Sequence, residues 1–171
     1  MKTTLNQIID ILDCDGLDEA LIALDQAQGH DREIRLYASW CARQVESLMT
    51  DKRSISALDV AERYANGLAT ADELSLASVA ADAAATDVSA DVARAMQWAV
   101  EWNAAQDAGL AAALAATSCV AATLAARNAA CYAVGAAAGA AGTESADQWD
   151  AAEAAREAQE KRLREVCAAI D

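Results

Sequence analysis

Residues 109–142 form the segment that most constrains how this chain can fold. Half of these residues are alanine, and Arg127 is the only charged residue among them. On a helix that turns about 100° per residue, the segment divides into a face of large side chains, which includes Leu124 and Tyr132, and a face of alanine. A helix that is apolar on every side belongs either in a globular core or in a membrane.

The sequence favours a core position for this segment over a membrane span. Alanine contributes weakly to membrane insertion, and Arg127 lies near the middle, where a charge is costly. We therefore expect residues 109–141 to form a central helix whose alanine face lets a neighbouring backbone approach to about 8 Å. A helix of this length would be unusually long, so we expect a break near Gly135, Gly139 or Gly142.

Helical periodicity continues through the rest of the chain, and no stretch shows the alternation typical of a β-strand. Thr70 and Glu73 match a capping box, and Ser54 can cap the preceding helix. The helical pattern restarts at Asp87 or Ser89.

The C-terminal helix has a stripe that is polar in its middle, so we expect it to dock by its two ends. Trp149 marks one of these ends. Because alanine buries little area, the four tryptophans are expected to carry much of the large-residue packing: Trp40, Trp98, Trp102 and Trp149.

These patterns predict an all-α protein with one domain, residues 1–171, and no β-sheet. Seven or eight helices pack around the central alanine-rich helix at about 109–141. The expected parts are N-terminal helices in 1–50, middle helices in 54–107, the alanine-rich core helix in 109–142 and an amphipathic C-terminal helix in 144–170.

The residues needed for common chemistries are missing. His30 is the only histidine, which excludes a histidine-based triad and a site with several histidine ligands. No glycine-rich phosphate loop is present. We therefore expect no catalytic activity, no metal and no cofactor. The five cysteines are odd in number and form no Cys-x-x-Cys pair, which is typical of free thiols in the cytoplasm.

The formal net charge of −14 limits the kinds of partner. It disfavours direct binding to nucleic acid and to anionic membranes, and it suits a protein partner with a basic surface. Solubility of an alanine-rich chain is an alternative explanation for the charge. The carboxylates of a candidate acidic interface are Asp82, Asp87, Asp91, Glu101 and Asp107.

Two further groups of residues are candidates for special roles. Arg127 is expected to be a structural buried charge, because a buried arginine needs a carboxylate partner. Trp98, Trp102 and Tyr132 could line a small-molecule pocket, although aromatic residues at helical spacing are more often core residues.

The segment 36–74 followed by alanine-rich helices resembles a group of alanine-rich proteins proposed to act as immunity proteins. They occur near bacterial polymorphic toxins and also in tailed-phage genomes. The matching positions are Trp40, Cys41, Ala42, Val45, Asp51, Arg53, Ala57, Leu58, Ala61, Tyr64, Gly67, Glu73 and Leu74. The resemblance implies an all-helical, inhibitor-like binding protein and no reaction.

Together these observations predict a cytoplasmic, non-enzymatic inhibitor of phage or bacterial origin. Its partner would be a toxin, as for an immunity protein, a host defence factor, as for an anti-defence protein, or a nucleic-acid-binding effector. Two alternatives stay open. The chain could be a structural homo-oligomer that associates through its alanine and glycine faces, or a protein that sequesters a small molecule.

Overall fold

The structure is a computed structural model that describes residues 5–24, 29–94, 122–141 and 145–169. Every regular element in these ranges is helical, which confirms the all-α prediction. The helices are α1 (Leu5–Cys14), α2 (Leu17–Ala23), α3 (Asp31–Arg43), the short 3-10 helix η2 (Glu46–Leu48), α4 (Lys52–Ala65), α5 (Ala71–Arg94), α7 (Ala122–Ala140) and α8 (Ser145–Ala168).

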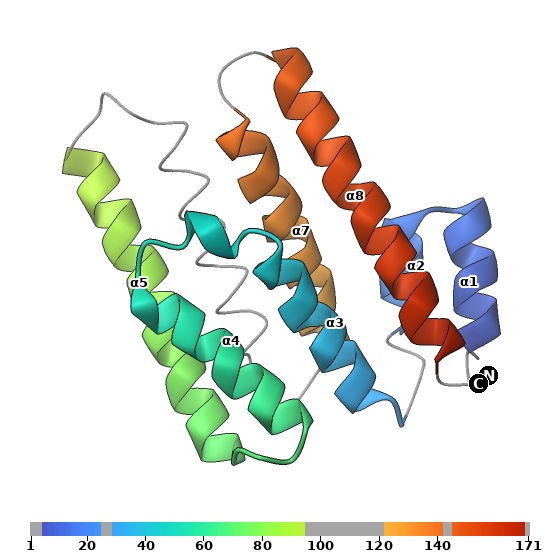
Figure 1. Cartoon of the computed structure of the whole chain (residues 1–171), viewed down its shortest axis with the longest axis horizontal. Helices are drawn as coiled ribbons and strands as arrows, with labels where there is room; N and C mark the ends of the chain where they lie inside the picture. The colour runs from blue at the N-terminus through green and yellow to red at the C-terminus, as the bar shows by residue number, and fades with distance from the viewer. Residues whose placement is uncertain (1–4, 25–28, 95–121, 142–144, 170–171) are drawn as a thin grey trace.

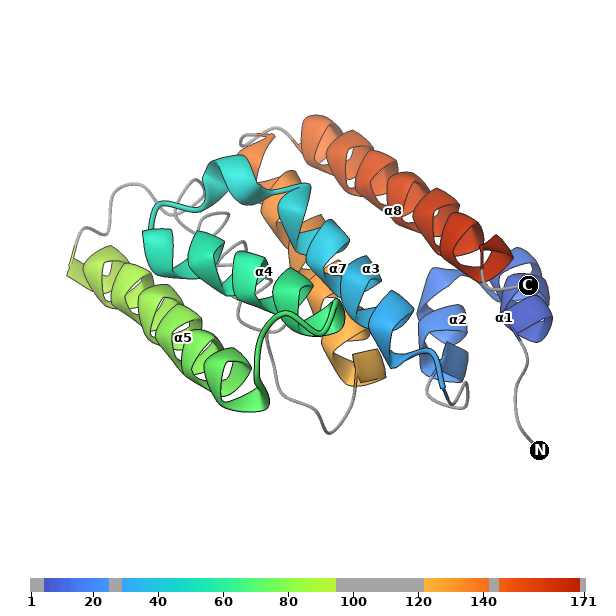
Figure 2. The same ribbon diagram turned by 60° about the horizontal axis from the view of Figure 1, so that its bottom comes forward.

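The helices are arranged around the pair formed by α3 and α7 (Figure 1). Helix α8 covers α7 and also contacts α3. Helix α4 packs on the other side of α3 and carries α5 at the edge of the molecule, as Figure 2 also shows. Helices α1 and α2 pack beside α8, and α2 also contacts α7. The alanine-rich segment therefore does form a central helix over the part that is described.

The alanine face of α7 is the face that packs. Ala129, Ala133 and Ala136 are fully buried, whereas Cys131 is exposed. Small side chains let α7 lie close to its neighbours. The helix runs through Gly135 and Gly139 without the expected break and ends at Ala140, and Gly142 lies outside the described residues.

Tyr37 of α3 lies at the centre of the main core, where α3 and α8 meet. Its side chain is completely buried, and its hydroxyl donates a hydrogen bond to the backbone oxygen of Gln159 in α8, 3.4 Å away. Burial raises the pKa of this hydroxyl, so it stays protonated and remains a donor.

Two of the expected helix starts are corrected. Asp51, and not Ser54, caps α4, because its carboxylate accepts a hydrogen bond from the Arg53 backbone N–H at 2.8 Å. Ser54 is buried within the helix. Helix α5 continues through Asp87 without a restart, because no glycine or proline interrupts it and Asp87 pairs with Arg53 instead of capping a helix.

The capping box at the start of α5 is confirmed. The Thr70 hydroxyl accepts from the Glu73 backbone N–H at 3.2 Å, and the Glu73 carboxylate accepts from the Thr70 backbone N–H at 2.7 Å. Two backbone donors at the helix start are thereby satisfied.

The prediction that α8 docks by its two ends is wrong. Trp149, near the start of the helix, is 77% exposed, whereas Gln159 in the polar middle is only 2% exposed. The buried side of α8 continues through Leu163 and Cys167. Two contacts with α3 hold the middle of α8. The backbone oxygen of Gln159 accepts the hydrogen bond from the Tyr37 hydroxyl, and the Arg162 guanidinium lies 6.0 Å from the centre of the Trp40 ring.

None of the helices in the described ranges has the length and apolarity needed to cross a membrane.

Two substitutions on α8 test this corrected view of its packing. Leu163→Ala should lower the free energy of unfolding by about 2–5 kcal/mol, because it empties a buried position. Trp149→Ala removes a larger side chain but should cost less than about 1 kcal/mol, because the ring is mostly solvated. Urea unfolding followed by circular dichroism measures both. A larger loss for Trp149→Ala than for Leu163→Ala would contradict the packing.

Candidate protein-binding surface

Helix α5 lies at the edge of the fold and packs mainly on α4 (Figures 1 and 2). Its inner side carries small and apolar residues, among them Leu74, Ala81 and Ala85, and all three are buried. Leu76 and Val79 lie on roughly the opposite side of the helix at 100° per residue. They are 72% and 67% exposed. The helix therefore has two apolar sides, of which only one is used by the fold.

We call the solvent-facing side of this helix the α5 outer face, formed by Asp72, Leu76, Val79, Ala83 and Asp87. All five residues are exposed. Leu68, in the turn that leads into α5, adds another largely exposed apolar side chain. The face thus has an apolar centre with a carboxylate toward each end.

Arg53 fixes the orientation of α5 relative to α4. Its guanidinium donates to Asp51 at 2.7 Å and to Asp87 at 2.6 Å. The same guanidinium, together with the Arg53 backbone N–H, lowers the pKa of Asp51. At the other end of α5, Arg63 lies 3.5 Å from Glu73. Two exposed ion pairs thus connect α4 to α5, one near the start of α5 and one at Asp87.

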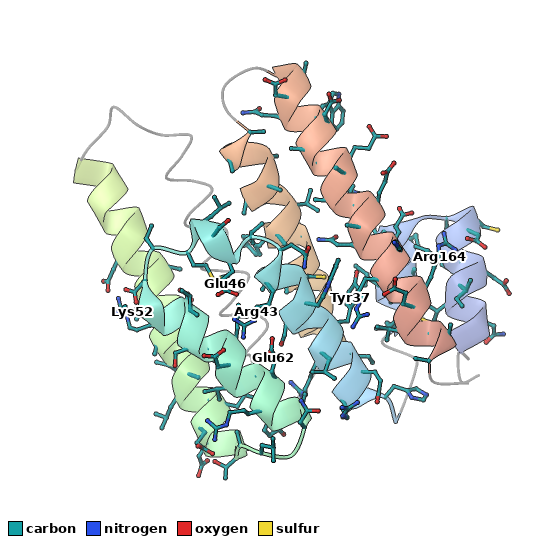
Figure 3. The ribbon with its side chains drawn as sticks, in the orientation of Figure 1. Tyr37, Arg43, Glu46, Lys52, Glu62 and Arg164 are labelled. Carbon is teal, nitrogen blue, oxygen red and sulfur yellow. The ribbon has the colours of Figure 1, made fainter. Side chains whose placement is uncertain are left out.

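A second arginine connects α3, η2 and α4. Arg43 donates to Asp59 at 2.7 Å, to Glu46 at 2.8 Å and to Glu62 at 2.9 Å (Figure 3). The bond to Glu62 is the main cause of the raised pKa of Arg43, so the guanidinium stays charged. Arg43 is therefore committed to contacts among α3, η2 and α4, whereas Arg53 pairs with Asp87 of the α5 outer face.

The structure describes only part of the predicted acidic interface. Asp82 and Asp87 are both exposed on α5, and Asp87 is paired with Arg53. Asp91 lies in α5, but its side chain is outside the described residues, as are Glu101 and Asp107 altogether.

The predicted pocket residues are not brought together in the described part of the chain. Trp98 and Trp102 lie outside the described residues. Tyr132 of α7 is half-buried and packs against the main core. Its position is that of a core residue, which is the alternative that its helical spacing also allowed.

The buried charge that the structure describes is Arg35, which sequence reasoning missed. The side chain of Arg127 in α7 is outside the described residues. Arg35 is only 4% exposed, and its guanidinium lies 5.3 Å from the centre of the Tyr64 ring. Arg35 lies about 100° around α3 from Ile34, on the side that meets Tyr64 of α4, so the apolar stripe in the sequence did not mark it.

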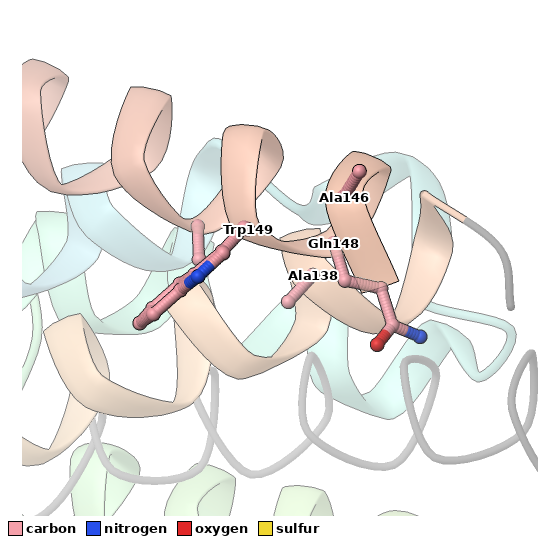
Figure 4. A pocket seen from close by; sticks show the side chains of 5 residues that line it. Ala138, Ala146, Gln148 and Trp149 are labelled. Carbon is pink, nitrogen blue, oxygen red and sulfur yellow. The ribbon is translucent and has the colours of Figure 1, made fainter. Parts of the chain in front are cut away.

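An open groove lies between the end of α7 and the start of α8 (Figure 4). It has a volume of about 640 Å³. The described residues that line it are Ala138, Ala146, Gln148, Trp149 and Ala152. Its lining is therefore mostly alanine, with one exposed indole at its side.

The thiols of the described residues divide into two classes. Cys14 and Cys131 are exposed, whereas Cys41 and Cys167 are buried. Burial raises the pKa of Cys41 to about 12. No group of three or more histidine, cysteine or acidic side chains in the described ranges is arranged to hold a metal ion.

Comparison with family models, with curated proteins and with solved structures finds no match to this chain. The resemblance to alanine-rich immunity proteins therefore stays a prediction from the motifs.

The lowered pKa of Asp51 predicts an acid-sensitive cap at the start of α4. A carboxyl whose folded pKa lies below its unfolded value of about 4 stabilises the fold above that pH, and this contribution is lost as the pH falls through the folded pKa. Asp51→Asn keeps an oxygen that can cap the helix but removes the charge. We expect the variant to be less stable than the native chain at pH 7 and nearly equal to it at pH 2.5. Melting temperatures at both pH values test this, and a constant difference would contradict it.

The thiol classes predict different rates of modification. With a thiol-specific disulfide reagent at pH 8, Cys14 and Cys131 should react in the native state, and Cys41 and Cys167 only after unfolding. Mass spectrometry of peptides from the modified protein identifies each site. Native-state modification of Cys41 as fast as that of Cys131 would contradict the burial.

Proposed function

We propose that this chain is a non-catalytic binding protein that neutralises a partner protein with a basic surface, and that the α5 outer face is the contact surface. One observation carries the proposal. An edge helix that already buries one apolar side on α4 exposes Leu76 and Val79 to solvent, with Asp72 toward one end and Asp87, which pairs with Arg53, toward the other.

The need for solubility explains exposed acids, but it does not explain exposed acids next to exposed apolar side chains. A chain that needs charge to stay dispersed gains nothing from leucine and valine on its surface. Adjacent exposed apolar residues bordered by polar ones are typical of an interaction site.

The carboxylates and the apolar side chains of this face would contribute to binding in different ways. Carboxylates steer a basic partner toward the surface and exclude acidic ones. Apolar side chains at the centre of an interface supply most of the affinity once they are desolvated. A partner that fits would therefore carry an apolar patch bordered by lysine or arginine.

The charge also bears on the homo-oligomer alternative. Two copies that met through their α5 outer faces would bring acidic residues together in a chain whose net charge is already −14. The repulsion disfavours this pairing, and a different protein is the better occupant.

The resemblance to alanine-rich immunity proteins supports the same class of function. It points to a bacterial toxin as the target, or to a host defence factor if the chain is encoded by a phage. Both kinds of target can act on nucleic acid and so can carry a basic surface.

The proposal is tested by capture of a partner on the immobilised chain. The native chain should retain a specific basic protein at low salt and lose much of it at high salt. The double variant Leu76→Ser/Val79→Ser should reduce recovery by roughly tenfold or more.

Ile22→Ser is the matched control, because Ile22 is a half-exposed apolar residue on α2, away from α5. It should leave recovery unchanged. Equal recovery by the native chain and the double variant would contradict the proposal, and so would retention that does not depend on salt.

A further inference from the structure

We propose that the open groove between α7 and α8 receives a short amphipathic, basic helix of the partner. This inference rests on the proposed function, because it takes the partner to be a basic protein. It adds a second contact surface, separate from the α5 outer face.

The fold already places a helix in a similar setting. Helix α2, seven residues long, contacts both α7 and α8 and buries Leu17, Ala20 and Leu21. Arg156 of α8 lies 3.5 Å from Asp18 of α2, which shows the side of α8 that faces α2.

Trp149 lies on this same side of α8. It precedes Arg156 by seven residues, which is nearly two full turns and about 10 Å along the helix axis. The groove beside Trp149 is lined by Ala138 of α7 and Ala152 of α8. Because these side chains are only methyl groups, they leave an open space beside Trp149 that a short helix could fill.

The exposed indole is the natural anchor for such a helix. Trp149 is 77% exposed although it borders an apolar groove, and tryptophan is among the residues that most often dominate binding energy. Its ring can cover an apolar side chain of the partner and can also stack on a cation.

The charges near the groove select a basic occupant. Asp150 and Glu153 are exposed on the first turns of α8. Glu153 follows Trp149 by four residues, so the side chains of Trp149 and Glu153 lie on one side of the helix. Where this side of α8 faces α2, it carries Arg156, which pairs with Asp18 of α2. Next to the open groove it carries Glu153, which would pair with lysine or arginine.

The occupant is therefore a helix with apolar residues at the spacing of Leu17, Ala20 and Leu21 and with basic residues at the other positions. A second copy of this chain does not fit this description, because its long exposed helix, α5, is acidic.

A synthetic peptide tests the proposal on the intact chain. The probe is an acetylated, amidated peptide of repeated Leu-Lys-Lys-Ala, which keeps the Leu-x-x-Ala-Leu spacing of α2 and replaces its acids with lysine. A scrambled peptide of the same composition is the control for charge alone. Calorimetry gives the Kd, and the indole N–H resonance of Trp149, assigned by its absence in Trp149→Phe, reports where the peptide binds.

We expect the probe to bind more tightly than the scrambled peptide and to shift the Trp149 resonance. Trp149→Ala should raise the Kd by roughly tenfold or more, and Glu153→Lys should raise it several-fold. The double variant Leu76→Ser/Val79→Ser should leave the Kd unchanged. Because Trp149 is mostly solvated, Trp149→Ala should keep the native helical content, which circular dichroism checks.

An unchanged Kd in Trp149→Ala, or equal binding of the scrambled peptide, would overturn the proposal. Loss of binding only in the α5 double variant would also overturn it while supporting the α5 outer face. Groove binding by the peptide without any partner captured on the chain would instead support the groove and count against the proposed function.

Discussion

The methyl groups of Ala129, Ala133 and Ala136 bring α7 against its neighbours at the centre of the molecule. Each alanine buries little apolar area, so the stability of this contact depends on close fit rather than on large side chains. Tyr37 supplies the bulk that alanine lacks, and its hydroxyl connects α3 to the backbone of α8. The outer helices are then added to this centre: Arg43 connects α3 to α4, and α5 packs on α4 through the buried cluster of Ala57, Ala61, Leu74 and Ala81.

Helical period and capping chemistry predicted most of the fold. The described part of the alanine-rich segment, residues 122–140, forms a helix, and the Thr70–Glu73 capping box begins α5, because helix formation and capping depend mainly on local residues. The pattern placed the cap of α4 at Ser54 and could not show that Asp51 caps it instead, because both residue types can cap and the extended backbone of Asp51 decides the matter. The exposure of Trp149 was also beyond it, because periodicity gives the direction of a side chain but not whether a neighbouring helix reaches it.

Less of the candidate site was predictable. Acidity indicated a basic partner, and Asp82 and Asp87 are exposed on α5 as an acidic interface requires. The sequence could not place Leu76 and Val79 on the surface, because α5 has apolar residues on two sides and only the packing shows which side meets α4. Arg35 was missed for the same reason, since its burial follows from the face of α3 on which it lies.

The protein is thus a helical bundle in which Arg43 and Arg53 pair with acids of the same chain, while other acidic residues and some apolar residues face solvent. Hydrogen exchange of the chain with and without its captured partner tests this claim most directly. The account predicts that the partner slows exchange in residues 71–87 and in residues 145–156, with little change in α1. Slowed exchange confined to α1 and α2, or none in residues 71–87, would contradict it.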